Sequence, residues 1–334
     1  MTKLIPIPCL VALAALLSCG ETQEQTIDQL TFDRPVDIAF ACHGQLRITN
    51  GGAADPSLPI QVSAMPPFAC ETRSQAPVEI PCKPGSTEQP TPPGQETLRD
   101  ANCNITSQVS PVSWYGLILQ SGPGTVALAQ FGTKPGATLA SDADAGLSVL
   151  DADLLTPGKN SISVGEEPVA IHTDPAGCHA ITANAGSCDL SVLDIGSAID
   201  SALGQERAVR VDRLTVKNAS GQPILARPAA MVGEASSALI GTSCKDKAGP
   251  EGIVYVAYPS CHLVAAVDTS TGTIVSGIQY GTNGVPAIVG GDVTCPAECG
   301  GGGTVTPGVR PVTLDVRVDP RSDTRRLAIG ADNS

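Results

Sequence analysis

Aromatic side chains are scarce in this sequence, and their scarcity argues against two classes of protein. Only 3% of the 334 residues are Phe, Trp or Tyr, and Trp114 is the single tryptophan. A repeat fold that carries one tryptophan in each unit is therefore disfavoured. A sugar-binding surface is disfavoured as well, because such surfaces usually stack flat rings on their ligand.

Basic side chains are also in the minority. The chain has 20 Lys and Arg against 33 Asp and Glu, so its formal net charge is −13. Neutralising the phosphates of a nucleic acid takes clustered Lys and Arg, and the sequence contains no such cluster. We therefore expect no nucleic-acid partner and interpret the charge as a solvated acidic surface.

The short motifs of several enzyme classes are missing. The sequence has no GxSxG, no P-loop, no GxGxxG, no HExxH and no CxxCH. A Ser-His-Asp triad is recognised by its geometry, so the sequence leaves that arrangement open. With no catalytic motif to name, we predict no cofactor and favour a protein that performs no chemistry.

Some carboxylates are spaced as in a calcium loop. Asp142, Asp144 and Gly146 match the opening of such a loop, but its closing Glu and other oxygen ligands are missing. We therefore interpret this stretch as a solvated loop. Asp151 and Asp194 are expected to end strands and to accept hydrogen bonds in turns.

Cys-His dipeptides combine ligands that suit zinc or copper. They are Cys42-His43, Cys178-His179 and Cys261-His262. Adjacent residues on a strand point to opposite faces, so a Cys and the His after it cannot easily share one metal. We therefore predict no metal site, and interpret each pair as a disulfide cysteine followed by a surface histidine.

The stretch Pro168–Asp194 has the pattern of three short strands joined by tight turns. Its first apolar run ends at Asp174-Pro175-Ala176-Gly177, which has Pro where a turn presets φ and Gly where it needs positive φ. The second run ends at Asn184, and the third alternates as a half-buried strand does. Residues 160–165 are expected to form the outermost strand of the preceding unit, so one unit has four strands.

This unit recurs along the chain. SVLD occurs at Ser148–Asp151 and again at Ser191–Asp194, 43 residues apart, which is a propeller-blade spacing. A relative, Ala265–Asp268, is followed by Thr271-Gly272 and one more strand. Strands led by proline recur at Pro35, Pro168, Pro228 and Pro311, with a weaker candidate at Pro111. We predict an all-β fold, a β-propeller of four-stranded antiparallel blades with four to five blades present.

The sequence Val164–Asp194 resembles the YVTN repeat of bacterial β-propellers. In that repeat a Val-Gly leads to a Pro, an apolar strand, an Asp-Gly-type turn, a strand ending in Asn and a strand ending in Asp. Here Ile181–Asn184 occupies the position of the Tyr-Val-Thr-Asn sequence for which the repeat is named. The match is good over Tyr255–Ile278 and fair over Arg310–Asn333. The resemblance implies a propeller and no single activity, and no catalytic residue of its lactonase-like members can be matched.

The first 18 residues are predicted to be a lipoprotein signal peptide. Lys3 supplies a basic start, and the apolar run Cys9–Leu17 is too short to span a bilayer. Leu17-Ser18-Cys19 resembles a lipoprotein processing site, so we predict that Cys19 is acylated, for example with palmitate, and anchors the protein in the outer membrane. The alternative is an ordinary secretory signal that holds a Cys. Residues 19–31 would form a polar tether.

Ten of the 12 cysteines remain once Cys9 and Cys19 are set aside, an even number that suits disulfides in an oxidising compartment. Alignment of the repeats places Cys178 and Cys188 of one unit at the positions of Cys244 and Cys261 in the next. We therefore predict the disulfides Cys178–Cys188 and Cys244–Cys261. Cys295 and Cys299 most simply close a loop. The connectivity stays open for Cys42, Cys70, Cys82 and Cys103.

These observations predict three segments and one function. After the signal peptide and the tether, residues 32–334 would form the propeller, with a Pro- and Cys-rich insertion at about 71–103. Because the last unit begins a blade without completing it, we expect the sequence to be part of a longer protein. The prediction is a cell-envelope lipoprotein that binds a protein, peptide or envelope component, or acts as a scaffold. The alternatives are a lactonase-like or metal-assisted hydrolase that uses the central funnel, and a structural module of a larger exported protein.

Overall fold

A computed structural model of the protein describes most of the chain after the predicted tether. The described residues are 32–50, 53–54, 61–64, 70, 96–99, 105–132, 146–150, 161–202, 209–233, 242–244, 247–300, 307–318 and 325–333. The predicted signal peptide, Cys19, the tether and most of the predicted insertion lie outside them. So do Asp142, Asp144, Asp151, Cys82 and Cys103.

The fold of the described residues is all-β and its sheets are antiparallel, as the sequence predicts. The helices that lie wholly within these ranges are α3 (Ile195–Ala202) and the 3₁₀ turn η3 (Pro259–Cys261). No helix of the described part has both the length and the apolar character needed to cross a membrane.

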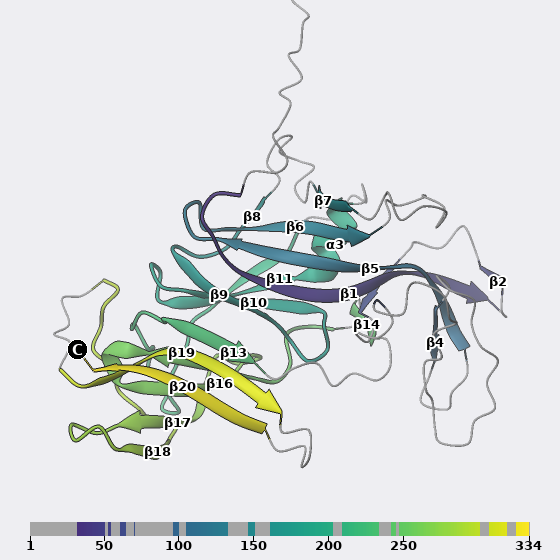
Figure 1. Ribbon diagram of the computed structural model, residues 1–334. Helices are drawn as coiled ribbons and strands as arrows, with labels where there is room; N and C mark the ends of the chain where they lie inside the picture. Colours follow the sequence, from purple (N-terminus) through teal and green to yellow (C-terminus); the bar gives the residue numbers. More distant parts are fainter. Residues whose placement is uncertain are drawn as a thin grey trace, which may run out of the picture. The chain divides into compact units, whose positions relative to one another are not determined.

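The first sheet is built around two long strands, β1 and β5, which run side by side in Figure 1. Its path is β14-β3-β1-β5-β6-β7, with β2 paired to β1, β4 to β5 and β8 to β6. The strands are β1 (Pro35–Asn50), β2 (Ala53–Ala54), β3 (Gln61–Ala64), β4 (Glu96–Arg99), β5 (Ile105–Gln120), β6 (Thr125–Gly132), β7 (Gly146–Leu150), β8 (Ser161–Ser163) and β14 (Thr242–Ser243). The pairing of β8 with β6 confirms the outer strand predicted at residues 160–165.

The second sheet confirms the predicted four-strand unit. Its strands follow in chain order: β9 (Pro168–Thr173), β10 (His179–Asn184), β11 (Asp189–Asp194) and β12 (Val211–Leu214). The turn after β9 has Gly177 at φ +73°, as its sequence requires. Every residue of β10 is buried, so this strand is covered on both faces of the sheet.

The third sheet has five strands and the fourth has two. The third runs β13 (Ala230–Gly233), β15 (Ile253–Tyr258), β16 (Leu263–Asp268), β17 (Ile274–Tyr280) and β18 (Pro286–Gly290). The fourth is the ribbon of β19 (Val309–Val318) and β20 (Arg325–Asn333), yellow in Figure 1. The strand predicted after Thr271-Gly272 is β17.

The first strands of the four sheets contact one another in succession. β1 contacts β9, β9 contacts β13, and β13 contacts β19. Apolar side chains fill the space between consecutive sheets, with one cluster shared by the first and second sheets and another by the second and third. The first three sheets are therefore held together by apolar packing.

Two features of the predicted repeat are wrong. Pro111 lies inside β5, the second strand of its sheet, and leads no strand. Ser148–Leu150 of the first SVLD lie in β7, the fourth strand of the row β1-β5-β6-β7, whereas the second SVLD lies in β11, the third strand of its sheet. The 43-residue spacing therefore joins strands that are not equivalent. Insertions of different length separate the sheets, so the first strands begin at residues 35, 168, 230 and 309.

A different feature does repeat in three dimensions. The residue just before the third strand of each unit has positive φ, at Gly124, Cys188 and His262. Each of these residues ends a four-residue turn that connects the second strand to the third. The equivalent turns therefore share their backbone conformation although two of the three residues are not glycine.

Asn184 at the end of β10 forms a buried polar network below this turn. Its Nδ2 donates to Asp189 Oδ1 and to Ser191 Oγ, both at 3.0 Å, and its Oδ1 accepts from Thr182 Oγ1 at 3.0 Å. Gly165 lies against the Asn184 side chain so closely that a Cβ added there would overlap it. The buried Asn184 side chain therefore requires a glycine at position 165, in the Val-Gly that precedes β9.

We expect Gly165→Ala to lower the free energy of unfolding by about 2 kcal/mol, because the new methyl group overpacks a buried site. Urea unfolding followed by circular dichroism measures this change. Gly290→Ala is the matched control, because a Cβ at Gly290 in β18 would meet no atom within 4 Å. Equal stability of the two variants would contradict this account of Gly165.

Candidate functional site

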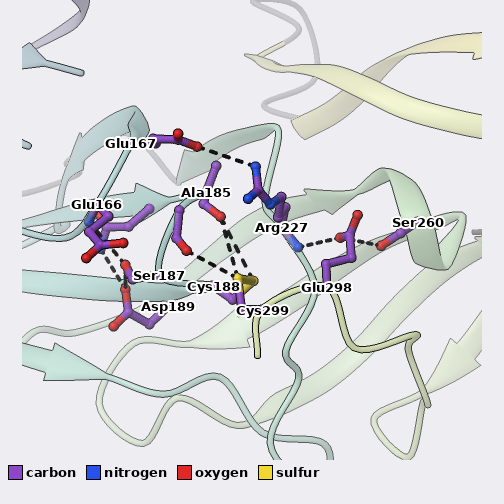
Figure 2. The surroundings of a disulfide bond; sticks show 12 residues. Glu166, Glu167, Ala185, Ser187, Cys188, Asp189, Arg227, Ser260, Glu298 and Cys299 are labelled. Carbon is purple, nitrogen blue, oxygen red and sulfur yellow. Dashed lines mark hydrogen bonds and ion pairs between the residues drawn. A yellow bond between two sulfur atoms is a disulfide. The ribbon is translucent and has the colours of Figure 1, made fainter. Parts of the chain in front are cut away.

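The disulfide Cys188–Cys299 joins two sheets and is surrounded by charged side chains (Figure 2). Cys188 ends the turn between β10 and β11, and Cys299 follows β18 of the third sheet. The sulfur of Cys299 lies 3.3 Å from the carbonyl oxygen of Gly186, a close contact without a proton because the sulfur is bonded to its partner. The disulfide thus fixes the chain after the third sheet onto a turn of the second.

Glu298 extends this connection to two further segments. Its Oε2 accepts from the backbone N of Arg227 at 2.7 Å and from Ser260 Oγ at 2.8 Å, as Figure 2 shows. The guanidinium of Arg227 in turn lies 3.4 Å from Glu167, just before β9. The Glu298 carboxylate is therefore occupied by structural donors.

Asp189 accepts a comparable set of donors on the other side of the disulfide. Its Oδ1 accepts from Ser187 Oγ at 2.7 Å, and its Oδ2 accepts from Arg213 Nε at 2.7 Å. Arg213 also donates to the carbonyl oxygen of Val164 at 3.2 Å. This carboxylate therefore connects β11 with β12 and with the segment before β9.

A second polar cluster, the Asp174 cluster, lies at the opposite end of the β10–β11 hairpin. Asp174 is 1% exposed. Its Oδ1 accepts from the backbone N of Cys178 at 2.9 Å and of His179 at 3.0 Å. Its Oδ2 lies 3.2 Å from His179 Nδ1 and 3.3 Å from the backbone N of Glu251, which precedes β15. One buried carboxylate thus accepts donors from two sheets.

His43 connects the first sheet to the Asp174 cluster. Its Nε2 donates to the carbonyl oxygen of Gly177 at 2.7 Å, in the turn that Asp174 begins. Its Nδ1 is buried and has no hydrogen-bond partner among the described residues. Burial lowers the pKa of His43 from 6.5 to about 4, although the Gly177 carbonyl and the Asp174 charge both act to raise it. The ring is therefore neutral at pH 7.

The pKa of His43 predicts a loss of stability in acid. The unfolded chain, with its ordinary pKa of 6.5, binds a proton more readily than the folded chain. Stability is therefore complete above about pH 6.5 and falls by about 3 kcal/mol as the pH approaches 4. Urea unfolding at a series of pH values measures the slope. We expect His43→Gln, which keeps a donor for Gly177, to flatten it, and an unchanged slope in that variant would contradict this assignment.

An apolar surface lies on one side of the first sheet, and we call it the aromatic face. It consists of Ile38 and Phe40 of β1, Trp114 of β5 and Phe131 of β6. The ring centre of Phe40 lies 6.4 Å from that of Trp114 and 5.5 Å from that of Phe131. Ile38 is 40% exposed and Phe40 is 48% exposed. The only tryptophan and two of the four phenylalanines therefore gather at one partly solvent-exposed site.

The six cysteines proposed as disulfide candidates all form disulfides, but in other pairs than predicted. The structure joins Cys178 to Cys244, Cys188 to Cys299 and Cys261 to Cys295. A fourth disulfide joins Cys42 to Cys70. The predicted pair Cys178–Cys188 is wrong because these residues stand at opposite ends of the β10–β11 hairpin, roughly 20 Å apart, whereas a disulfide needs Cα atoms within about 7 Å. The predicted pairs Cys244–Cys261 and Cys295–Cys299 are wrong as well, because Cys244 is bonded to Cys178, Cys261 to Cys295 and Cys299 to Cys188.

The predicted surface histidines need a similar correction. His43 and His179 are buried, at 1% and 5% exposure, and both form hydrogen bonds. The expectation for Asp194 is confirmed, because this residue ends β11 and its Oδ1 accepts from the backbone N of Ser197 at 2.9 Å. Across the described ranges, no three His, Cys, Asp or Glu side chains are arranged to hold a metal ion.

The aromatic face and the role of Glu298 were not predicted from the sequence. The alternation of Ile38 and Phe40 was a signal for the face, but low aromatic content across the chain concealed it. No sequence pattern marks Glu298, because its partners come from distant segments.

Comparison with known proteins gave no match to any family model, to any curated protein or to any solved structure.

Proposed function

We propose that the protein is a cell-envelope lipoprotein whose sheets form a YVTN-like β-propeller, and that this domain is a non-catalytic binding or scaffold module. The succession of first strands β1, β9, β13 and β19 supports the propeller, because the inner strands of consecutive blades would contact one another in this way. The second sheet, with its strands in chain order, supports the four-stranded blade.

One observation carries the proposal for function. The side chains that most often perform chemistry connect one sheet to the next in this protein. His43 donates to the second sheet, Asp174 accepts from the third, and Cys188 is bonded to Cys299. A catalytic base or nucleophile must be free to reach a substrate, whereas the His43 ring is buried, the Asp174 carboxylate accepts several hydrogen bonds and Cys188 is bonded to another sulfur.

The disulfides support the proposed location. The disulfides of the described residues join segments that are distant in sequence, with separations of 28, 66, 111 and 34 residues. Such bonds form and persist in oxidising compartments such as the periplasm or the cell surface. A rigid, exported domain with fixed loops is suited to presenting a surface to a protein, peptide or envelope component.

The proposal is tested on protein extracted from membranes. We expect an intact mass that includes acyl chains on Cys19, and we expect Cys19→Ser to move the protein out of the membrane fraction. We also expect no turnover of ester, lactone or peptide substrates by the purified protein. An unmodified Cys19 would contradict the anchor, and a product that accumulates with time would contradict the non-catalytic module.

A further inference from the structure

The aromatic face lies at the point where the fold begins. Phe32, the first described residue, packs against the buried cluster of Ile118, Ala127 and Ala129 on the first sheet. Phe131 packs against the same cluster, so the chain enters the domain on the side of the sheet that carries the aromatic face. The chain therefore joins the domain on the same side of the first sheet as this face.

The length of the preceding segment limits that distance. Phe32 follows Cys19 by 13 residues, which span at most about 45 Å when fully extended. If Cys19 carries the lipid, as the proposed function requires, the domain stays within this distance of the bilayer. A weak surface contact then suffices, because the tether turns binding into an intramolecular step at high effective concentration.

The chemistry of the face suits the interface of a bilayer. Ile38 and Phe40 are exposed along β1, and Val36, two residues earlier, is 48% exposed. A tryptophan beside exposed aliphatic side chains is typical of surfaces that sit at the boundary between headgroups and acyl chains. Two exposed side chains of opposite charge, Asp33 and Arg34, precede the strand, so no cationic cluster points to anionic headgroups.

We propose that the aromatic face, together with Val36, rests on the phospholipid surface to which the chain is anchored. Val36, Ile38 and Phe40 enter the interfacial region, and Trp114 lies at the level of the headgroups. This inference depends on the proposed lipidation of Cys19. Because the chain has a net charge of −13, attraction to anionic lipid makes no contribution, and docking is insensitive to salt.

The single tryptophan provides a direct probe. The lipidated protein is reconstituted in phosphatidylcholine vesicles, with and without bromine-labelled acyl chains, and vesicle flotation is measured together with Trp114 fluorescence. We expect bromine to quench Trp114 in the floated protein. The variant Val36→Ser/Ile38→Ser leaves Phe40 and Phe131 around the indole and should reduce the ratio of docked to undocked protein at least about tenfold. Val285→Ser/Ile288→Ser, at exposed apolar positions just before and within β18, is the matched control and should leave quenching unchanged.

Each other outcome overturns the inference and has a separate meaning. Protein that floats with an unquenched Trp114 keeps its anchor but does not dock through this face. Protein that does not float, with an unmodified Cys19 by mass, contradicts the anchor and the docking that depends on it. If Trp114 is unquenched and the protein forms dimers, and if Val36→Ser/Ile38→Ser abolishes those dimers, the face binds a second copy of the chain.

Discussion

The variant Cys188→Ala/Cys299→Ala is expected to lower the free energy of unfolding by about 3 to 4 kcal/mol. This disulfide closes the longest loop of the four, with a sequence separation of 111 residues. Its removal restores conformational freedom to the unfolded chain, although Cys178–Cys244 and Cys261–Cys295 still shorten the loop. The folded state also loses the covalent connection between the second and third sheets. Urea unfolding under non-reducing conditions measures the difference.

Counting thiols separates this pairing from the one that repeat alignment predicts. If Cys188 is bonded to Cys299, the double variant has the same number of free thiols as the original protein. If Cys188 were bonded to Cys178, and Cys299 to Cys295, the variant would gain two thiols. The thiols are titrated after denaturation without reductant, and a gain of two would contradict the structure.

Asp174→Ala is the substitution with the other large expected effect, a loss of about 4 kcal/mol in the free energy of unfolding. The carboxylate accepts two backbone N–H groups of its own turn, the ring of His179 and the backbone N of Glu251. Alanine leaves these donors buried without partners, which costs more than the bonds themselves contribute. Circular dichroism during urea unfolding measures the loss.

Two variants test this explanation of Asp174. Asp174→Asn keeps one oxygen for the turn but presents an amide to Glu251, so we expect an intermediate loss. Asp212→Ala is the control, because the Asp212 side chain is 77% exposed and lies 3.9 Å from Arg210, and we expect it to change stability by less than about 0.5 kcal/mol. Similar losses at Asp174 and Asp212 would show that Asp174 has no special structural role.

Local sequence signals predicted the second sheet well. The Asp174–Gly177 turn, the buried run ending at Asn184 and the apolar pattern after Asp189 specify β9, β10 and β11, although β11 is buried from Leu190 to Asp194 and is not the half-buried strand that the alternation predicted. In these strands hydrophobic period and turn chemistry agree, and agreement between the two makes a local prediction reliable.

The errors came from features that depend on contacts between sheets. The repeated SVLD is a short apolar pattern that suits a third or a fourth strand equally well, so sequence identity suggested a false equivalence. The pairing of Cys188 with Cys299 depends on how the second and third sheets pack. Spacing along the chain does not carry that information, which is why local pairs were predicted.

The buried histidines illustrate the same limit. His43 and His179 follow cysteines in strands and were predicted to face solvent. The face of a strand that carries a histidine is decided by what packs on it. Here the turn after β9 supplies the Gly177 carbonyl to His43 of the first sheet and the Asp174 carboxylate to His179 of its own sheet. The aromatic face arises in a related way, because β1, β5 and β6 bring together residues up to 93 positions apart in a chain with few rings.

The disulfides Cys178–Cys244 and Cys188–Cys299 and the side chain of His43 connect successive sheets, and this arrangement supports the proposal of an exported, non-catalytic domain. Proteolysis of the non-reduced protein, followed by mass identification of the linked peptides, tests it most directly. The structure predicts peptides that join Cys42 to Cys70, Cys178 to Cys244, Cys188 to Cys299 and Cys261 to Cys295. Peptides that join Cys178 to Cys188, or cysteines that are all reduced in freshly isolated protein, would contradict it.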